Sequence, residues 1–138
     1  MILINTYLIS LKIMPKYNLF VCKSCHPSSQ ERPENPPFDG EILLEKLNYL
    51  CSEESSLHEI EIKPVECLWA CNHGCVVAAS HPDKPSYLFV NLTPEESAAS
   101  LLEFMQLYVK SRKGNVAWKQ LPEVLQAAIF AQIPPGER

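Results

Sequence analysis

The chain has 138 residues, of which 46% are hydrophobic and 20% are charged. This length and this balance fit one domain with a substantial apolar core. The formal net charge is −4 at pH 7, whereas non-specific binding to nucleic acid requires a basic face. The composition therefore argues against a nucleic-acid partner and leaves a protein or a small molecule open.

The N-terminal stretch "MILINTYLISLKIM" carries no clear signal for secretion or membrane insertion. Lys12 follows the apolar run, whereas a secretory signal has its positive charge before that run. The run is also too short to span a bilayer. We interpret residues 1–13 as an N-terminal extension, with Met14 as a candidate natural start, and residues 14–138 as a single metal-binding domain. We expect it in the cytoplasm, with no membrane partner.

The first half of the chain predicts a strand, a helix and a second strand. "YNLFVC", residues 17–22, is a short apolar run, and the Pro- and Ser-rich residues after it form a loop. Asp39 is a candidate N-cap for a helix to about Cys51, where leucines recur at helical spacing. "EIEIKPVE", residues 59–66, alternates as a half-buried strand does, and Pro64 indicates that this strand frays or lies at a sheet edge.

The second half predicts a hairpin and two helices. "CVVAAS" and "SYLFVNL" flank the turn "HPDKP" and predict antiparallel strands. Thr93, Pro94 and Glu96 have the types and spacing of an N-cap, a first-turn proline and a capping-box partner, so they predict a helix over residues 94–111. A last short helix is expected from Pro122 to about residue 130, with Trp118 packing across the domain.

This β-α-β-β-β-α order, with a hairpin after the second strand, predicts a thioredoxin-like α/β fold. We expect a mixed four-stranded sheet with flanking helices and a short C-terminal helix. Both cysteine groups follow predicted strands, which end at Val21 and near Glu66. If these strands are parallel neighbours, their carboxyl ends lie side by side, so the two loops bring four or five thiols together.

The cysteines themselves are unevenly spaced. Cys22 and Cys25 form a C-x-x-C pair, whereas Cys67, Cys71 and Cys75 recur every four residues in "CLWACNHGC". In a reducing compartment, clustered cysteines bind metal or carry out redox chemistry more often than they form structural disulfides. The spacing therefore predicts a metal or redox site that involves both groups.

Two stretches of the chain resemble known families. "VECLWAC" followed by "VVAAS" resembles the second ligand pair of the thioredoxin-like [2Fe-2S] ferredoxins, which include a subunit of bacterial NADH dehydrogenases. The region from about residue 17 to residue 135 is more closely similar to a bacterial family of small predicted metal-binding proteins, domain of unknown function 1636. The segments that carry this similarity, in the same order, are "LFVCKSC", "PVECLWACNHGCVVA", "YLFVNLTPE", "AWKQLPEVL" and "IPP".

The resemblance implies a set of ligands. Cys67 and Cys71 correspond to the second pair, Cys22 and Cys25 are the expected first pair, and Cys75 is an alternative ligand. The first pair is more closely spaced than in the ferredoxins.

Residues around these thiols would form the surroundings of the site. Trp69 stands where the ferredoxins usually carry glycine in C-L-G-A-C, and with Leu68 it would shield a cluster from water. His73 is expected as an exposed turn residue, with the alternatives that it is itself a ligand or donates a hydrogen bond to one, and Gly74 completes the turn. Cys51, by contrast, lies on the apolar face of its helix and is predicted to be a core residue.

The function implied by the resemblance is that of a small [2Fe-2S] protein that carries single electrons to a redox partner protein, with no catalytic turnover of its own. A structural or metal-handling zinc site is the alternative, because four thiolates in two short pairs also suit tetrahedral zinc. A thiol redox protein is less favoured, since the Pro-rich loop separates Cys25 from the next helix N-terminus, which would lower a thiol pKa. We expect a monomer or a homodimer.

Overall fold

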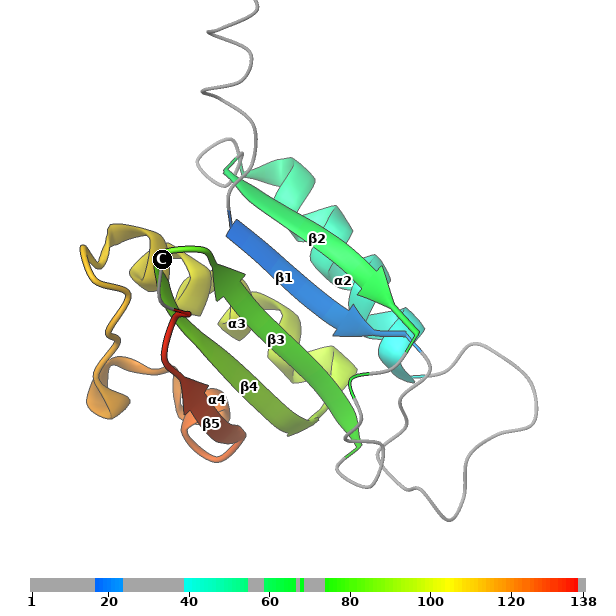
Figure 1. The fold of residues 1–138 in the computed structure, drawn as a ribbon. Helices are drawn as coiled ribbons and strands as arrows, with labels where there is room; N and C mark the ends of the chain where they lie inside the picture. Colours follow the sequence, from blue (N-terminus) through cyan, green and yellow to red (C-terminus); the bar gives the residue numbers. More distant parts are fainter. Residues whose placement is uncertain (1–16, 24–38, 55–58, 67, 69–73, 137–138) are drawn as a thin grey trace, which may run out of the picture.

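The computed structural model describes residues 17–23, 39–54, 59–66, 68 and 74–136. These residues form two layers, a β-sheet and a layer of helices that covers one of its faces (Figure 1). In chain order the elements are β1 (Tyr17–Cys22), α2 (Asp39–Glu53), β2 (Ile60–Val65), β3 (Cys75–His81), β4 (Lys84–Leu92), α3 (Pro94–Lys110), a 3-10 helix (Trp118–Gln120), α4 (Glu123–Gln126) and β5 (Ile129–Ile133).

The sheet has the strand order β2-β1-β3-β4-β5. β1 and β2 are parallel, whereas the β1–β3, β3–β4 and β4–β5 pairs are antiparallel, so the sheet is mixed as predicted. β2 lies at one edge, which fits the position of Pro64 because proline cannot donate to a neighbouring strand. The predicted element order up to α3, including the hairpin, is confirmed.

The core lies between the sheet and the helices α2 and α3. Alternate residues of β1, such as Leu19 and Val21, are fully buried, and they pair with Ala79 and Val77 of β3. The helices contribute the fully buried side chains Leu43, Leu47, Leu101, Phe104, Met105 and Tyr108. Both helices are therefore held on the same sheet face by a continuous apolar layer.

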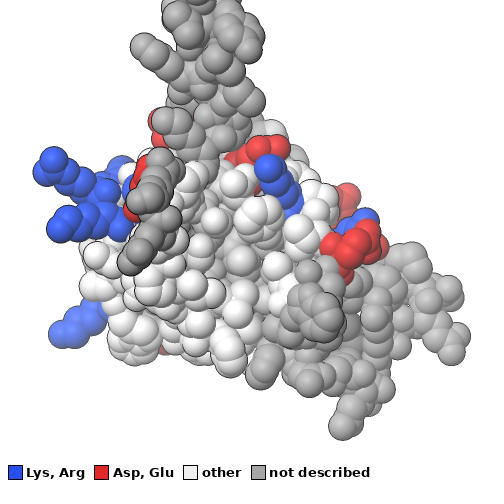
Figure 2. Space-filling view, in the orientation of Figure 1, with Lys and Arg blue, Asp and Glu red and all other residues white. Residues whose placement is uncertain are grey.

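The opposite sheet face carries little charge in its described part, and its charged side chains gather toward the margins (Figure 2). Within the described ranges, no helix is long and apolar enough to cross a membrane.

The C-terminal part differs from the prediction. The sheet has five strands rather than four, because the expected last helix is confined to α4 and the chain continues as β5. β-branched and aromatic residues, here Ile129, Phe130 and Ile133, favour an extended chain. β5 also pairs with β4, which would otherwise present an unpaired edge. This tertiary pairing outweighed the local helical pattern.

Two local expectations are also corrected. α3 begins at the predicted position, but the Thr93 side chain makes no capping hydrogen bond. The Thr93 backbone N–H instead donates to the hydroxyl of buried Ser97 at 3.1 Å. In the predicted capping box, the Glu96 side chain would have accepted this hydrogen bond. Trp118 does not pack across the domain, since its 3-10 helix leaves the side chain 58% exposed.

The buried side chain of Lys84, which was not predicted from the sequence, caps the C-terminal end of α3. The Lys84 ammonium donates to the Tyr17 hydroxyl at 2.6 Å and to the carbonyls of Tyr108 and Val109 at 3.0 and 3.2 Å. These carbonyls belong to the last turn of α3, which has no intrahelical donors for them. Lys84 thus joins the first strand to the end of the helix.

Candidate metal centre

The carboxyl ends of β1 and β2 lie side by side, as the sequence predicted. In the parallel register Cys22 pairs with Val65, and the Lys23 N–H donates to the Val65 carbonyl at 3.0 Å. The loop with Cys25 leaves from one of these ends, and the loop with Cys67 leaves from the other. The fold therefore starts both cysteine loops at the same edge of the sheet.

Cys22 stands at this junction. Its side chain is 1% exposed, and its thiol donates to the backbone carbonyl of Glu66 across a distance of 3.8 Å. Glu66 immediately precedes Cys67 in the chain. A thiol from the first cysteine pair thus contacts the residue next to the second group.

The remaining predicted site residues are only partly covered by the structure. Those that lie outside the described residues are Cys25, Cys67, Trp69, Cys71 and His73. Leu68 is partly buried against the core. Gly74 is buried and has a φ of 68°, in the left-handed region that glycine adopts without steric cost, so it permits the turn into β3.

Cys75 is buried in the core at the start of β3, where it pairs with Leu92 at the end of β4. It is 0% exposed, and burial is the main cause that raises the pKa of its thiol to about 12. Electrostatic interactions, that with Asp39 being the largest, raise this pKa further. In the metal-free protein, burial therefore favours the neutral thiol of Cys75 over the thiolate that a metal ligand requires.

The start of α2 is packed directly against the end of β1. A Cβ atom at Gly40 would lie 2.9 Å from the carbonyl carbon of Lys23 and 3.0 Å from its Cα, and it would overlap the Cys22 carbonyl oxygen. Only glycine allows this approach. The N-terminus of α2 thereby restricts the backbone position of Cys22. The spacing of residues in the sequence did not predict this contact.

An ion pair joins the two strand ends on the outside. The Lys23 ammonium lies 2.8 Å from the Glu66 carboxylate, and the two side chains are 41% and 82% exposed. The hydrogen bond with Glu66 is the main cause that raises the pKa of Lys23, followed by the charge of the same carboxylate. The acidic charge next to Cys67 is thus largely compensated by a neighbouring cation.

Two cysteines are described at this edge, Cys22 at the end of β1 and Cys75 at the start of β3, and neither belongs to a disulfide. Cys25, Cys67 and Cys71 lie outside the described residues. Within the part of the chain that the structure describes, no group of three or more His, Cys, Asp or Glu residues could hold a metal ion. Soft thiolate ligands suit zinc and iron–sulfur clusters and do not suit magnesium or calcium.

Cys51 has a different environment. It lies on α2, partly buried against the core, and burial raises the pKa of its thiol. This placement agrees with the predicted packing role.

Fold and site define a small α/β protein, built on a mixed sheet that is covered by helices on one face. Its described cysteines Cys22 and Cys75 lie where β1 ends and β3 begins. Residues 19–135 match the family described as "Protein of unknown function (DUF1636)", and the chain belongs to this family. The similarity inferred from the cysteine motifs is thereby confirmed. A comparison with curated protein sequences finds no match.

The solved structures with a similar fold include several of the thioredoxin-like [2Fe-2S] ferredoxin of Aquifex aeolicus. One structure has a TM-score of 0.56 and 18% identity, covering 90% of this chain and 99% of the ferredoxin. A cysteine-to-serine variant of that ferredoxin gives a TM-score of 0.55 at 16% identity, covering 83% and 98% of the two chains. These matches confirm the thioredoxin-like fold.

Proposed function

We propose that this protein binds a [2Fe-2S] cluster and carries single electrons to a partner protein, without catalytic turnover of its own. The proposed ligands are Cys22, Cys25, Cys67 and Cys71. The observation that carries the proposal is the contact of the Cys22 thiol with the Glu66 carbonyl. It occurs at the edge where both cysteine loops begin, in a fold shared with a [2Fe-2S] ferredoxin.

The spacing of the second pair adds support. Two of the similar structures are serine variants of the Aquifex ferredoxin in which the replaced cysteines lie four positions apart. Cys67 and Cys71 have the same separation. A short turn with this spacing can direct two sulfurs to one iron, while the other iron takes the first pair.

Cys25 is preferred over Cys75 as the fourth ligand. Burial raises the pKa of the Cys75 thiol in the metal-free protein, which disfavours the thiolate that ligation requires. Cys75 remains the alternative if the loop with Cys25 does not reach the site.

The chain's own residues have three tasks at this site. The Cys22 thiol must lose its proton, and with it the hydrogen bond to the Glu66 carbonyl. Leu68, the residue after Cys67, is partly buried against the core and can exclude water from this edge. The pair of Lys23 and Glu66 adds no net charge near the thiolates. When bound, the cluster supplies the ability to accept and release one electron.

Chemical analysis of protein purified without oxygen tests this proposal. We expect about two iron and two acid-labile sulfide per chain, from the composition of the cluster. Absorbance in the visible range and a rhombic paramagnetic signal after reduction with dithionite should accompany them. A colourless protein with one bound zinc would instead support the structural or metal-handling alternative, because zinc has no redox chemistry. Metal-free protein with reactive cysteine pairs would favour the thiol redox alternative.

The charges of Lys23 and Glu66 should shift the reduction potential in opposite directions. Replacing Glu66 by glutamine leaves the Lys23 cation uncompensated, so the negatively charged reduced state is favoured and the potential should rise. Lys23→Gln should lower it by the same reasoning. Both shifts should be small and should diminish at high salt, since the side chains are exposed.

Redox titrations at low and high ionic strength would measure these shifts. The double variant K23Q/E66Q, which restores the charge balance, should have nearly the potential of the unmodified protein. Equal potentials in all variants at low salt would show that neither charge acts on the site.

A further inference from the structure

The outer surface of the helix layer contains a groove between α2 and α3. Two adjoining hollows of about 340 and 430 Å³ follow the line along which the helices pack. Leu50 of α2 and Ala99 of α3 line both hollows, which makes them one continuous feature. We refer to this feature as the α2/α3 groove.

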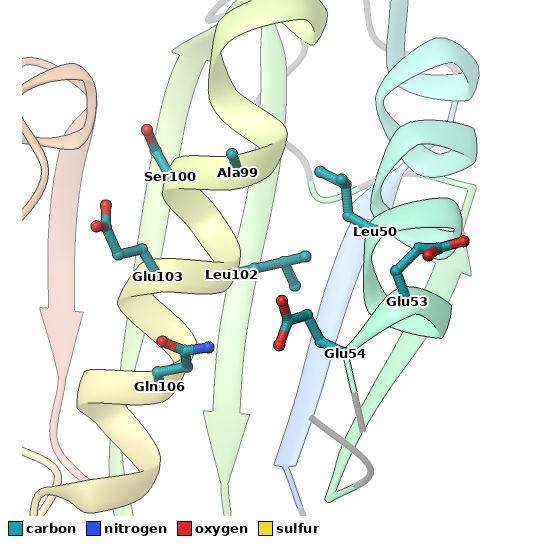
Figure 3. Close-up of a pocket in the computed structure, with 8 residues that line it drawn as sticks. All are labelled: Leu50, Glu53, Glu54, Ala99, Ser100, Leu102, Glu103 and Gln106. Atoms are coloured by element: carbon teal, nitrogen blue, oxygen red, sulfur yellow. The ribbon is translucent and has the colours of Figure 1, made fainter. Parts of the chain in front are cut away.

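The floor of the α2/α3 groove is apolar. Leu50 and Leu102 point toward each other from the two helices, and Ala99 lies beside them (Figure 3). Ala98 extends the apolar floor at the other hollow. Tyr49 also lines the groove and is 65% exposed. Aromatic side chains of this kind are frequent anchors in protein interfaces.

The lining of the groove is strongly acidic. Five carboxylates stand around the apolar floor, against a single ammonium, that of Lys46. The acidic residues that line the two hollows are Glu45, Glu53, Glu54, Glu95 and Glu103. An apolar strip between rows of carboxylates complements a helix that has leucine-like side chains on one face and lysine or arginine beside them.

We propose that the α2/α3 groove is the docking site for a basic amphipathic helix of a partner protein. Apolar side chains of that helix fill the space over Leu50 and Leu102, and its cations lie against the glutamates. A second copy of this chain is a poorer occupant, because a two-fold contact would place the same acidic surface against itself.

The position of the groove connects docking with the cysteine edge. Glu95 lines one end of the groove and belongs to the first turn of α3. Glu95 follows Leu92 by three residues, and Leu92 pairs with the buried Cys75 at the start of β3. A helix in the groove would therefore have one end close to the thiols, where a carrier exchanges electrons. The docking site itself does not depend on which metal the thiols hold.

A synthetic peptide provides the probe for this surface. We suggest a fluorescein-labelled 14-residue peptide of leucine and lysine arranged with helical period, followed by fluorescence anisotropy. A peptide of the same composition with alternating leucine and lysine is the matched control, because its apolar side chains do not form one helical stripe. We expect saturable binding of the helical-period peptide at low salt and much weaker binding of the alternating one.

Variants of the protein localise the binding. The triple variant E45Q/E53Q/E103Q should weaken binding about tenfold, from the usual range for exposed ion pairs. The control triple variant E59Q/E61Q/E123Q changes the net charge by the same amount outside the groove and should leave affinity essentially unchanged. Tyr49→Ser should weaken binding even at high salt, where charges are screened. Circular dichroism establishes that each variant is folded.

Three outcomes would overturn the proposal. Equal weakening by both triple variants would mean that net charge, not the groove, attracts the peptide. Equal binding of the two peptides would exclude recognition of an amphipathic helix. A dimer in light scattering that dissociates in the Tyr49→Ser variant would assign the groove to a second copy. None of these measurements requires a redox-active cluster. Rejection of the docking proposal would therefore not contradict the proposed electron-carrier function.

Discussion

Replacing Cys22 by serine should abolish or strongly reduce the visible absorbance of anaerobically purified protein. The Cys22 side chain lies where the two cysteine loops begin and contacts the Glu66 carbonyl. Serine has nearly the same shape but is a poor ligand for iron, so the change removes a ligand while disturbing packing little. Iron and sulfide content per chain, measured together with the spectrum, should fall in parallel.

Cys51→Ser is the matched control for this experiment. Cys51 lies on α2 and packs against the core, so its replacement should leave iron content and spectrum unchanged. Cys75→Ala should also retain the spectrum, because burial raises the pKa of the Cys75 thiol and so disfavours the thiolate that a ligand requires. Retention of the cluster in Cys22→Ser, or its loss in Cys75→Ala together with retention in Cys25→Ser, would require a different ligand set.

Local patterns were sufficient to predict most elements of the fold. The alternation of Ile60 and Ile62 with charged residues indicated β2, and the turn between two apolar runs indicated the β3–β4 hairpin. β5 could not be predicted in this way. Its residues follow a proline and a helical pattern, and their extended conformation depends on pairing with β4, which lies about 40 positions earlier in the chain.

The side-by-side arrangement of the strand ends that precede the two cysteine groups was predicted from the order of the elements. Strand order places the two cysteine loops at one sheet edge, and strand order follows from the element sequence. The residues that shape this edge were not apparent, because they act across long sequence separations. The Lys23–Glu66 pair joins residues 43 positions apart, and Gly40 matters only because the start of α2 meets the end of β1. Such contacts depend on the folded arrangement and leave no periodic signal.

Replacing Gly40 by alanine should destabilise the protein and reduce cluster content at the same time. Alanine is the better helix former by up to about 1 kcal/mol, which alone would favour the variant. The added methyl group, however, would overlap the Cys22 carbonyl oxygen and press on the Lys23 backbone. Overpacking of this kind usually costs about 1–3 kcal/mol. Because the obstructing atoms are backbone, they cannot turn aside as a flexible side chain would, so the steric cost should exceed the helical gain.

The two effects of Gly40→Ala can be measured separately. Urea denaturation of the metal-free protein reports the loss of stability, and iron content of the anaerobic protein reports the displacement of Cys22. Gly136→Ala is the matched control, since a Cβ atom there meets nothing within 4 Å, and it should change neither quantity. If Gly40→Ala lowers stability but leaves iron content unchanged, the start of α2 supports the fold without positioning the Cys22 thiol. Unchanged stability would mean that α2 can shift away from β1 to accommodate the methyl group. The close packing of Gly40 against β1 would then not determine the position of Cys22.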